Sequence, residues 1–113
     1  MEVFKEFTFD AAHWLPNVPD GHQCGRMHGH TYRVRLTVAG EVDPTSGFVI
    51  DFGDLKGKAK PVIDSLDHTV LNDSLANPTC ENLAIFLGHK IDGLSVIEVW
   101  ETPTSGCRLA LSG

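Results

Sequence analysis

The sequence predicts an α+β domain, in which two helices cover one face of an antiparallel β-sheet. Apolar and polar residues alternate towards both ends of the 113-residue chain, and this period of two is typical of half-buried strands. In the middle of the chain apolar residues recur every three or four positions, as they do on one face of a helix. The predicted element order is β-β-α-α-β-β, in which two hairpins are joined through a pair of helices.

The first part of the chain predicts two long strands. Residues 3–13 alternate apolar and polar side chains, and a loop rich in Pro, Gly and Asn follows at residues 15–27. The clearest alternation runs over residues 30–40, where one face carries Tyr32, Val34, Leu36 and Val38. A turn with Asp-Pro and Ser-Gly pairs at residues 41–47 then leads to a short predicted strand at residues 48–51.

The middle of the chain predicts two amphipathic helices. Residues 55–66 carry an apolar stripe, which is interrupted by Pro61. Because proline removes a backbone donor, we expect it to bend or break this helix. A loop at residues 67–78 precedes a second helix over residues 80–92, for which Thr79 is the expected N-cap.

The last part of the chain returns to the strand pattern. Residues 95–102 alternate, a turn is expected at residues 103–106, and residues 107–111 form the final strand. The sequence contains no internal repeat, low-complexity tract or linker. It therefore predicts a single domain over residues 1–113.

Composition and charge restrict the class of protein. The chain is 42% hydrophobic and 21% charged, as expected of a globular domain. No apolar run approaches the roughly 20 residues needed to cross a bilayer, and the segment "MEVFKEFTFD" lacks the apolar core of a secretory signal. A formal charge of -6 disfavours a nucleic-acid or membrane-surface binder. We expect a cytoplasmic protein, and an anionic small substrate stays open provided that basic groups cluster locally.

Three histidines form a candidate metal site. His28 and His30 lie two residues apart, so both imidazoles point to the same side if the strand begins this early. His13 ends the preceding predicted strand, and antiparallel pairing would bring all three rings together. Three neutral histidines with a fourth position open are the ligands of a catalytic zinc site. The alternative is that these are unrelated surface or core histidines.

The three cysteines are irregularly spaced, which argues against a disulfide framework. Cys24 lies in a polar loop close to His22 and Arg26, and a thiolate is favoured near cationic groups or a metal. We therefore expect Cys24 to be reactive. For Cys80 and Cys107 we expect packing.

Several acidic residues are candidates for chemistry. Asp67 precedes His68, and a carboxylate beside an imidazole can orient it and raise its basicity, although a solvated turn is the commoner reason for such neighbours. Glu101 ends the inward face of the predicted strand over residues 95–102. There it could accept two parallel hydrogen bonds from a planar ligand, with solvation at the sheet edge as the alternative. Glu81 is accounted for by the helix dipole alone.

Six short motifs, in this order, resemble those of the 6-pyruvoyl-tetrahydropterin synthase family: "FDAAHWL", "CGRMHGHTY", "GFVIDFGDLK", "LDHTVLN", "NPTCEN" and "WET". The form "CGRMHGH", with only three residues between Cys24 and His28, most resembles the bacterial branch, the 6-carboxy-5,6,7,8-tetrahydropterin synthases. The similarity covers the chain from about Phe7 to Cys107. Each motif is weakly specific by itself, and the series of six is strongly specific.

The resemblance implies the tunnelling fold, in which trimers close their sheets into a barrel and two trimers stack into a hexamer. It implies Zn²⁺ as the cofactor and active sites at subunit interfaces. The implied residues are the zinc ligands His13, His28 and His30, the catalytic Cys24, Asp67 and His68, and the pterin contacts Glu101, Glu81 and Thr79. In that family the Asp-His pair reaches the site from a neighbouring subunit. Arg26 is a candidate triphosphate contact, with a solvated loop arginine as the alternative.

The resemblance also implies a reaction. The substrate would be 7,8-dihydroneopterin triphosphate, and the product 6-carboxy-5,6,7,8-tetrahydropterin, with acetaldehyde and triphosphate released on the route to queuosine. Two alternatives stay open: a 6-pyruvoyl-tetrahydropterin synthase, which eliminates triphosphate only, and a zinc-dependent protein that binds pterins without converting them.

Overall fold

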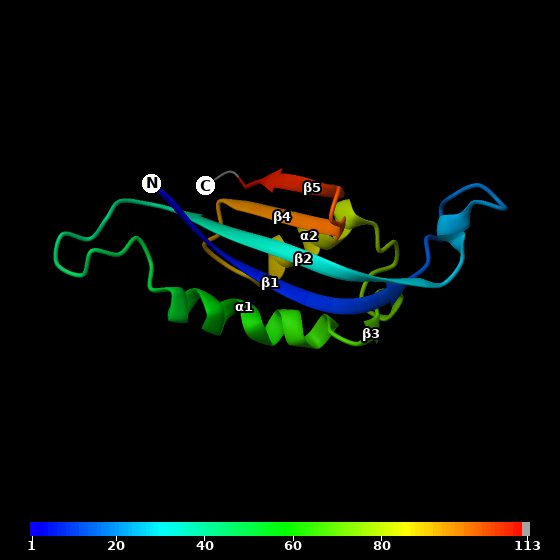
Figure 1. Cartoon of the computed structure of the whole chain (residues 1–113), viewed down its shortest axis with the longest axis horizontal. Coiled ribbons are helices and arrows are strands. Elements are labelled where there is room, and N and C mark those ends of the chain that lie inside the picture. The colour runs from blue at the N-terminus through cyan, green and yellow to red at the C-terminus, as the bar shows by residue number, and fades with distance from the viewer. Residues whose placement is uncertain (112–113) are drawn as a thin grey trace.

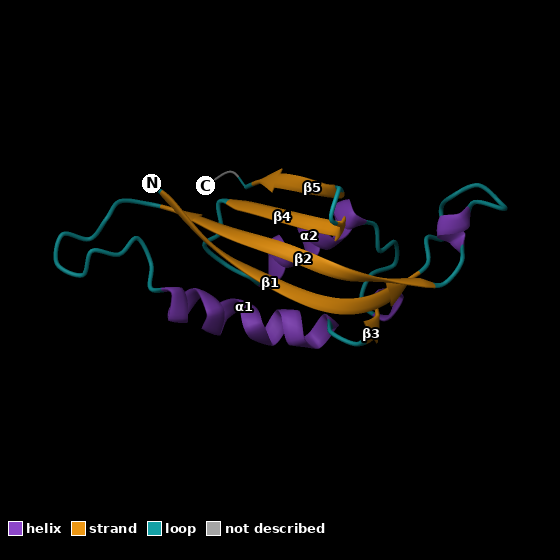
Figure 2. Cartoon of the chain, viewed as in Figure 1, coloured by secondary structure: helices purple, strands orange, loops and turns teal. Residues whose placement is uncertain are grey.

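The computed structural model describes residues 1–111, and its centre is a five-stranded sheet of order β3-β1-β2-β4-β5 (Figure 1). The strands are β1 (Glu2–His13), β2 (His28–Ala39), β3 (Thr69–Val70), β4 (Val96–Thr102) and β5 (Ser105–Ala110). The helices are α1 (Phe52–Leu66) and α2 (Cys80–Lys90), with short 3₁₀ turns η1 (Gln23–Gly25) and η2 (Leu71–Asp73). Both long helices lie on the same side of the sheet (Figure 2). The predicted α+β class is thereby confirmed.

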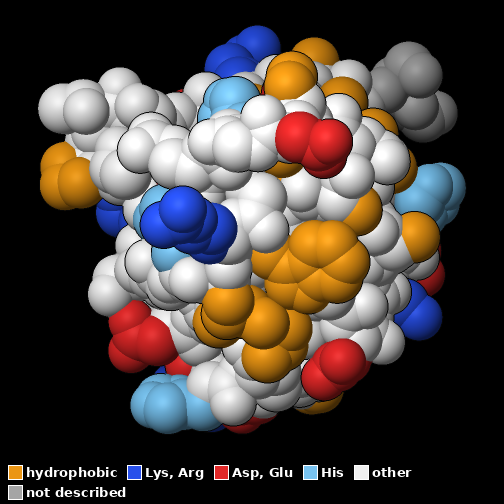
Figure 3. Space-filling view, turned by 90° about the vertical axis from the view of Figure 1, so that its right-hand side faces the viewer, with side chains coloured by type: hydrophobic (Ala, Val, Ile, Leu, Met, Phe, Trp, Pro, Cys, Tyr) orange, Lys and Arg blue, Asp and Glu red, His pale blue; other side chains and the backbone are white. Residues whose placement is uncertain are grey.

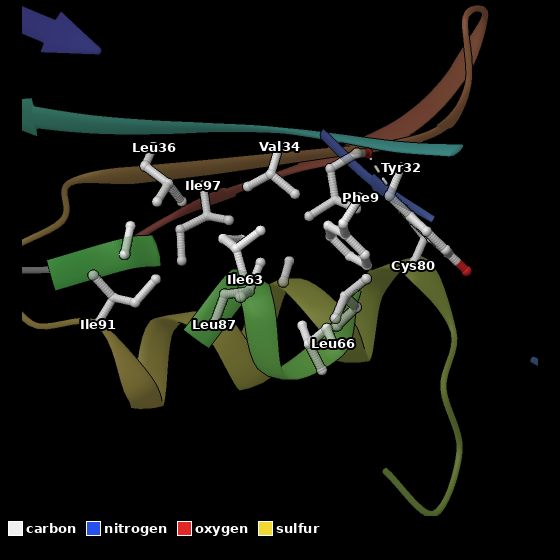
Figure 4. Close-up of a cluster of buried hydrophobic side chains, with 14 of the residues drawn as sticks. Phe9, Tyr32, Val34, Leu36, Ile63, Leu66, Cys80, Leu87, Ile91 and Ile97 are labelled. Atoms are coloured by element: carbon white, nitrogen blue, oxygen red, sulfur yellow. Dashed lines mark hydrogen bonds between the residues drawn. The ribbon is translucent and has the colours of Figure 1, made fainter. Parts of the chain in front are cut away.

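One hydrophobic core fills the space between the sheet and the two helices (Figure 4). The strands contribute inward side chains such as Tyr32, Val34 and Leu36, which are fully buried. The helices contribute the stripes that their period predicts, including Ile63 and Leu87. Each such side chain stabilises the fold by roughly 1.5–3 kcal/mol relative to exposure. This core sets which face of β1 and β2 points towards the helices, and therefore where their histidines lie.

The β1–β2 hairpin is the longest element pair and sets the register of the site. The two strands pair antiparallel along their whole length, with His13 opposite His28 and Ala11 opposite His30. β2 begins at His28, two residues before the predicted start. Both histidines of the His-Gly-His stretch therefore belong to the strand and share one face.

One prediction about the middle of the chain was wrong, and one of the two alternatives for Pro61 is excluded. Residues 48–51 are not a strand; the side chain of Asp51 accepts a hydrogen bond from the Gly53 N–H at 2.7 Å and caps α1, so the helix begins at Phe52. Pro61 does not break α1. Because Pro61 and Gly57 lie on the exposed face, the carbonyl that loses its partner can bind water.

The sheet also differs from prediction at its edges. The segment after α1, predicted as loop, forms β3, and it pairs parallel with β1 at Ala11 and Ala12. It does so because the open edge of β1 offers the Asp10 carbonyl to the N–H of His68, at 2.6 Å. β5 begins two residues earlier than predicted, at Ser105, and α2 ends two residues earlier, at Lys90.

Candidate metal centre and adjoining pocket

The three predicted histidine ligands meet at one end of the hairpin. Their ligand nitrogens all lie within 4.8 Å of one another, because His13 and His28 are cross-strand partners and His30 follows on the same face. His13 is buried, whereas His28 and His30 are half-buried. Figure 3 views the molecule from this end and shows histidine, basic and hydrophobic side chains close together at the surface.

Backbone carbonyls orient two of the imidazoles. Nδ1 of His13 lies 2.8 Å from the Pro78 carbonyl oxygen, and Nδ1 of His28 lies 2.7 Å from the Arg26 carbonyl oxygen. A carbonyl can only accept, so each Nδ1 carries the proton and each Nε2 keeps its lone pair. The two Nε2 atoms face each other at 3.0 Å. A cation between them would turn this repulsion of lone pairs into coordination.

The third imidazole has a buried nitrogen without a hydrogen-bond partner among residues 1–111, namely Nε2 of His30. Burial, followed by the imidazoles of His13 and His28, lowers the pKa of His30, and the nearby carboxylate of Glu101 opposes this shift. His30 is therefore kept neutral with a lone pair available. Three neutral nitrogen donors, one of them an orphaned buried atom, fit a zinc-type ion with an open position.

Tyr32 supports the cluster from below, and the sequence predicted it only as a core residue. Its hydroxyl lies 3.3 Å from Nδ1 of His13, and its ring packs edge-on against His13 and His30. Burial raises the pKa of Tyr32, so the phenol stays protonated. The signal available in the sequence is that Tyr32 continues the His28–His30 alternation on the same face.

A pocket of about 310 Å³ adjoins the histidines. It brings together the three predicted pterin contacts, and its lining consists of Leu15, Thr79, Cys80, Glu81, Glu101, Ser105 and Gly106. Glu101 connects pocket and cluster, because its Oε2 lies 3.9 Å from Nε2 of His30. Thr79 also caps α2, since its hydroxyl accepts from the Asn82 N–H at 3.1 Å. Carboxylates therefore line a small cavity beside the candidate metal centre.

The predicted Asp-His pair forms, on the other side of β1. Oδ1 of Asp67 lies 2.9 Å from Nδ1 of His68, and it also accepts from the Asp10 N–H at 3.0 Å. This backbone hydrogen bond, and then the His68 imidazole, lower the pKa of Asp67. His68 has a φ of 59°, a left-handed conformation that stores backbone strain in a non-glycine residue. Its side chain is 78% exposed.

A hollow of about 570 Å³ is lined by both His68 and His30. Asp10, Asp67 and His68 also form a second group of clustered ligand atoms. Two of these three residues are exposed. The Asp67–His68 pair thus lies at the surface of the chain.

Cys24 and Arg26 lie on the loop of residues 14–27, which projects from the end of the hairpin (Figure 1). Cys24 belongs to η1, where its N–H donates to Nδ1 of His22 at 3.0 Å. Within residues 1–111, its sulfur joins neither of the two groups of clustered ligand atoms. Arg26 is exposed, and its backbone carbonyl orients His28. The catalytic role of Cys24 and the triphosphate contact of Arg26 stay predictions.

Fold and site together define an α+β domain with a three-histidine centre beside an acidic small-molecule pocket. The chain belongs to the 6-pyruvoyl tetrahydropterin synthase family, whose sequence pattern matches residues 2–111.

Relatives and solved structures agree with this assignment. The 6-carboxy-5,6,7,8-tetrahydropterin synthase of Synechocystis is 42% identical, with 94% of this chain and 90% of that protein covered. The dihydroneopterin monophosphate aldolase of Pyrococcus furiosus is 37% identical, with 95% of each chain covered. The structure of Caenorhabditis elegans 6-pyruvoyl tetrahydropterin synthase superposes with a TM-score of 0.87 at 29% identity, over 99% of this chain and 96% of the other. The predicted tunnelling fold is thereby confirmed for the single chain, whereas its assembly into trimers and hexamers stays a prediction.

Among residues 1–111 no helix has the length and apolar character required to span a membrane.

Proposed function

We propose that this chain is a zinc-dependent lyase that converts 7,8-dihydroneopterin triphosphate and one water to 6-carboxy-5,6,7,8-tetrahydropterin, acetaldehyde and triphosphate. The observation that carries the proposal is the contact between the histidine cluster and the acidic pocket, made by His30 and Glu101 at 3.9 Å. The similarity to the Synechocystis enzyme supports the particular product. The product would enter 7-deazapurine synthesis, such as that of queuosine.

The pocket would hold the pterin ring. Its volume of about 310 Å³ lies at the lower end of the roughly 300–1,000 Å³ of small-molecule sites. Glu101 would accept the two parallel N–H groups on the pyrimidine edge of the pterin, which fixes the register of the ring. Thr79 and Glu81 line the same wall. The reacting side chain of the substrate would then extend from the pocket towards the histidines.

His13, His28 and His30 would hold the zinc ion. When bound, zinc would act as a Lewis acid that acidifies the hydroxyl groups of the substrate side chain and the adjacent C–H. The carbonyls of Pro78 and Arg26 would keep both Nε2 lone pairs directed at the ion. Tyr32, buried and protonated, would keep water from the rear of the cluster.

Cys24, Asp67 and His68 would move the proton. The Cys24 thiolate would take the proton from the substrate carbon and His68 would keep that thiolate basic, while Asp67 holds the His68 ring. The proton would return on the pterin ring, so the rearrangement needs no nicotinamide or flavin. General base catalysis of this kind typically contributes about 10²–10⁴-fold. Positioning and polarisation of the substrate would supply the rest of the rate enhancement.

The proposal includes a homo-oligomer, a trimeric barrel that stacks to a hexamer. Within residues 1–111, β1 has a free edge before Asp10, and β5 pairs only with β4. An edge strand at each end of a sheet lets copies join head to tail into a closed ring. Exposed Phe48 and Phe52 offer apolar surface for such contacts. A neighbouring copy would bring its Asp67 and His68 to this histidine cluster.

A cytoplasmic location also belongs to the proposal, supported by three free thiols. We further propose that the partners are small molecules and copies of this chain, and that neither nucleic acid nor membrane is bound.

Three other functions compete with this one. The Pyrococcus relative supports an aldolase, which would cleave the side chain of a dihydroneopterin monophosphate. The Caenorhabditis structure supports a 6-pyruvoyl-tetrahydropterin synthase, which would release triphosphate only. The free thiols and histidines are also compatible with a pterin-binding protein without turnover.

Product analysis separates these functions. The zinc-loaded chain would be incubated with dihydroneopterin triphosphate, and in parallel with the monophosphate, and all products identified by mass spectrometry. We expect 6-carboxy-tetrahydropterin and acetaldehyde from the triphosphate. Triphosphate without acetaldehyde would establish the pyruvoyl reaction, faster turnover of the monophosphate would establish the aldolase, and bound but unchanged substrate would establish the binding protein.

The pterin contact can be tested by a matched pair of substitutions on β4. Glu101→Gln replaces one acceptor by a donor, and we expect pterin affinity to fall roughly 10- to 100-fold. Glu98→Gln changes the same strand on the opposite face, where Glu98 lies 3.6 Å from Arg35, and should leave affinity unchanged. Affinity would be measured by calorimetry with a non-reacting pterin. Equal effects of the two substitutions would show that Glu101 does not contact the pterin.

A further inference from the structure

Two thiols that the proposed reaction does not use lie against each other at one wall of the pocket. Sγ of Cys80 is 3.4 Å from Sγ of Cys107. Cys80 is the first residue of α2, and Cys107 lies within β5, opposite Val99 of β4. The contact therefore joins a helix to the edge strand of the sheet. The sequence predicted only packing for both residues.

Backbone carbonyls hold both thiols in this arrangement. Sγ of Cys80 donates to the Val99 carbonyl oxygen at 3.3 Å, and Sγ of Cys107 donates to the Cys80 carbonyl oxygen at 3.4 Å. Cys80 is 8% exposed, whereas Cys107 is only half-buried. A solvent oxidant would therefore meet Cys107 first.

We propose that Cys80 and Cys107 are a redox pair, which a hydroperoxide converts into a disulfide between α2 and β5. The bond requires the sulfurs to approach from 3.4 Å to about 2.05 Å. The bond would stabilise one wall of the pocket.

The chemistry balances with the hydroperoxide as the only oxidant. The Cys107 thiolate attacks the outer oxygen of the peroxide, the O–O bond breaks, and an alcohol or water leaves as Cys107 becomes a sulfenic acid. The Cys80 thiolate then attacks that sulfur, the S–O bond breaks, and water leaves. Two thiols and one hydroperoxide thus give one disulfide, one water and one alcohol, or a second water when the oxidant is hydrogen peroxide.

The surroundings indicate a slow reaction that accelerates with pH. Burial raises the pKa of Cys80, and the neighbouring Cys107 thiol adds to the shift. Burial also raises the pKa of Cys107. Because the thiolate is the reacting form, the rate of oxidation should rise with increasing pH through the neutral range without levelling off there.

The position of the pair couples it to the site. Cys80 lines the pocket together with Glu81 and Glu101, and it follows Pro78, whose carbonyl orients His13, by two residues. Oxidation would therefore change the pocket wall and the start of α2 together. This consequence for ligand binding rests on the proposed function, whereas formation of the disulfide does not.

Peptide mapping tests the disulfide directly in the wild-type chain. Trypsin places the three cysteines in separate peptides, with Cys24 in residues 6–26, Cys80 in residues 59–90 and Cys107 in residues 91–108. After treatment with hydrogen peroxide at mildly alkaline pH, we expect the last two peptides to be linked, with a mass lower by two hydrogens. The link should be absent after dithiothreitol and in Cys107→Ser. Sulfinic acid on Cys107 without a link would overturn the proposal.

Thermal unfolding provides a second readout that needs no ligand. The link closes a loop across α2 and β4, so oxidation should raise the midpoint of unfolding by on the order of 10 °C. The rise should disappear in Cys107→Ser, which keeps the size of the side chain and its hydrogen bond. An unchanged midpoint of unfolding in the linked chain would contradict the proposed stabilisation by the disulfide.

Pterin binding tests the coupling. We expect oxidation to lower pterin affinity about 10-fold in the wild-type chain and not in Cys107→Ser. Unchanged affinity in the linked chain would overturn the coupling. Failure of the reduced chain to bind any pterin would instead count against the proposed function, and the disulfide would still be decided by the peptide map.

Discussion

Within a single chain, the histidine cluster is brought together more fully than the proposed proton-transfer residues are. His13, His28 and His30 come from one hairpin, and their ligand nitrogens already lie within 4.8 Å of one another. The Asp67–His68 pair is formed, but the His68 side chain is 78% exposed to solvent. Cys24 lies on a projecting loop. The proposed metal ligands thus lie together on one hairpin, whereas among the proposed catalytic residues His68 is exposed and Cys24 and Asp67 are half-buried.

The reason for this difference is the kind of element that carries each region. A long antiparallel hairpin has one register in which its apolar face is buried, so its side chains are strongly positioned. Loops carry fewer such constraints and take their final environment from whatever packs against them. Under the proposed function, we therefore expect one chain to suffice for metal binding and turnover to require Asp67 and His68 of a second copy.

The largest expected effect separates chemistry from metal binding. Cys24→Ala should lower kcat by roughly 10²–10⁴-fold, because it removes the proposed general base. Zinc content, measured by elemental analysis, should stay at the wild-type level, since Cys24 is not part of the histidine cluster. Turnover at the wild-type rate would exclude Cys24 from the mechanism.

The second largest effect concerns zinc binding by the histidine cluster. His28→Ala removes one of three nitrogen donors and should weaken zinc binding on the order of 10²- to 10³-fold. Competition with a chromophoric chelator measures this affinity. The matched control is His89→Ala, which changes an exposed histidine on α2 and should bind zinc normally. A normal affinity in His28→Ala would show that the cluster is not the metal centre.

Mixing two inactive variants tests whether a second copy completes the site. His28→Ala has an intact His68, and His68→Ala has an intact metal cluster. If each active site combines the cluster of one chain with His68 of another, refolding an equal mixture should restore about one site in four. If both groups act within one chain, the mixture should stay inactive, and this outcome would reject the interface model.

The smallest effect concerns the metal-free chain. The pKa of His30 is lowered from its ordinary 6.5 by burial, so the unfolded chain binds a proton at a higher pH than the folded chain does. The free energy of unfolding should therefore fall as the pH drops below about 6.5, and level off once the folded form also protonates. Denaturant titrations across this range would measure the slope. His30→Gln should flatten it, and an equal slope in that variant would assign the effect to other groups.

Local periodicity determined much of this protein from the sequence alone. The period of two predicted the long strands, the shared face of His28 and His30, and the inward position of Glu101. The three-to-four period predicted the buried stripes of both helices, and Thr79 marked the start of the second. These predictions succeeded because they depend on neighbours within a few positions of each other.

Predictions failed where a distant partner decides the outcome. Residues 48–51 have the composition of a short strand, yet Asp51 caps α1, and no neighbouring strand pairs with them in the described chain. Residues 69–70 read as loop, yet they pair with the edge of β1. Strand formation depends on an available edge, and a single segment does not contain that information.

Only the tertiary structure decided how the site is oriented. The Pro78 carbonyl that directs His13 lies 65 positions away in the chain, and Cys107 meets Cys80 across 27 positions. A carbonyl is present in every residue, so no side-chain pattern marks the one that will accept a hydrogen bond. The sequence by itself determined which groups are available and which face they share; packing between distant segments determined the protonated nitrogens, the orphaned lone pair of His30 and the contact between the thiols.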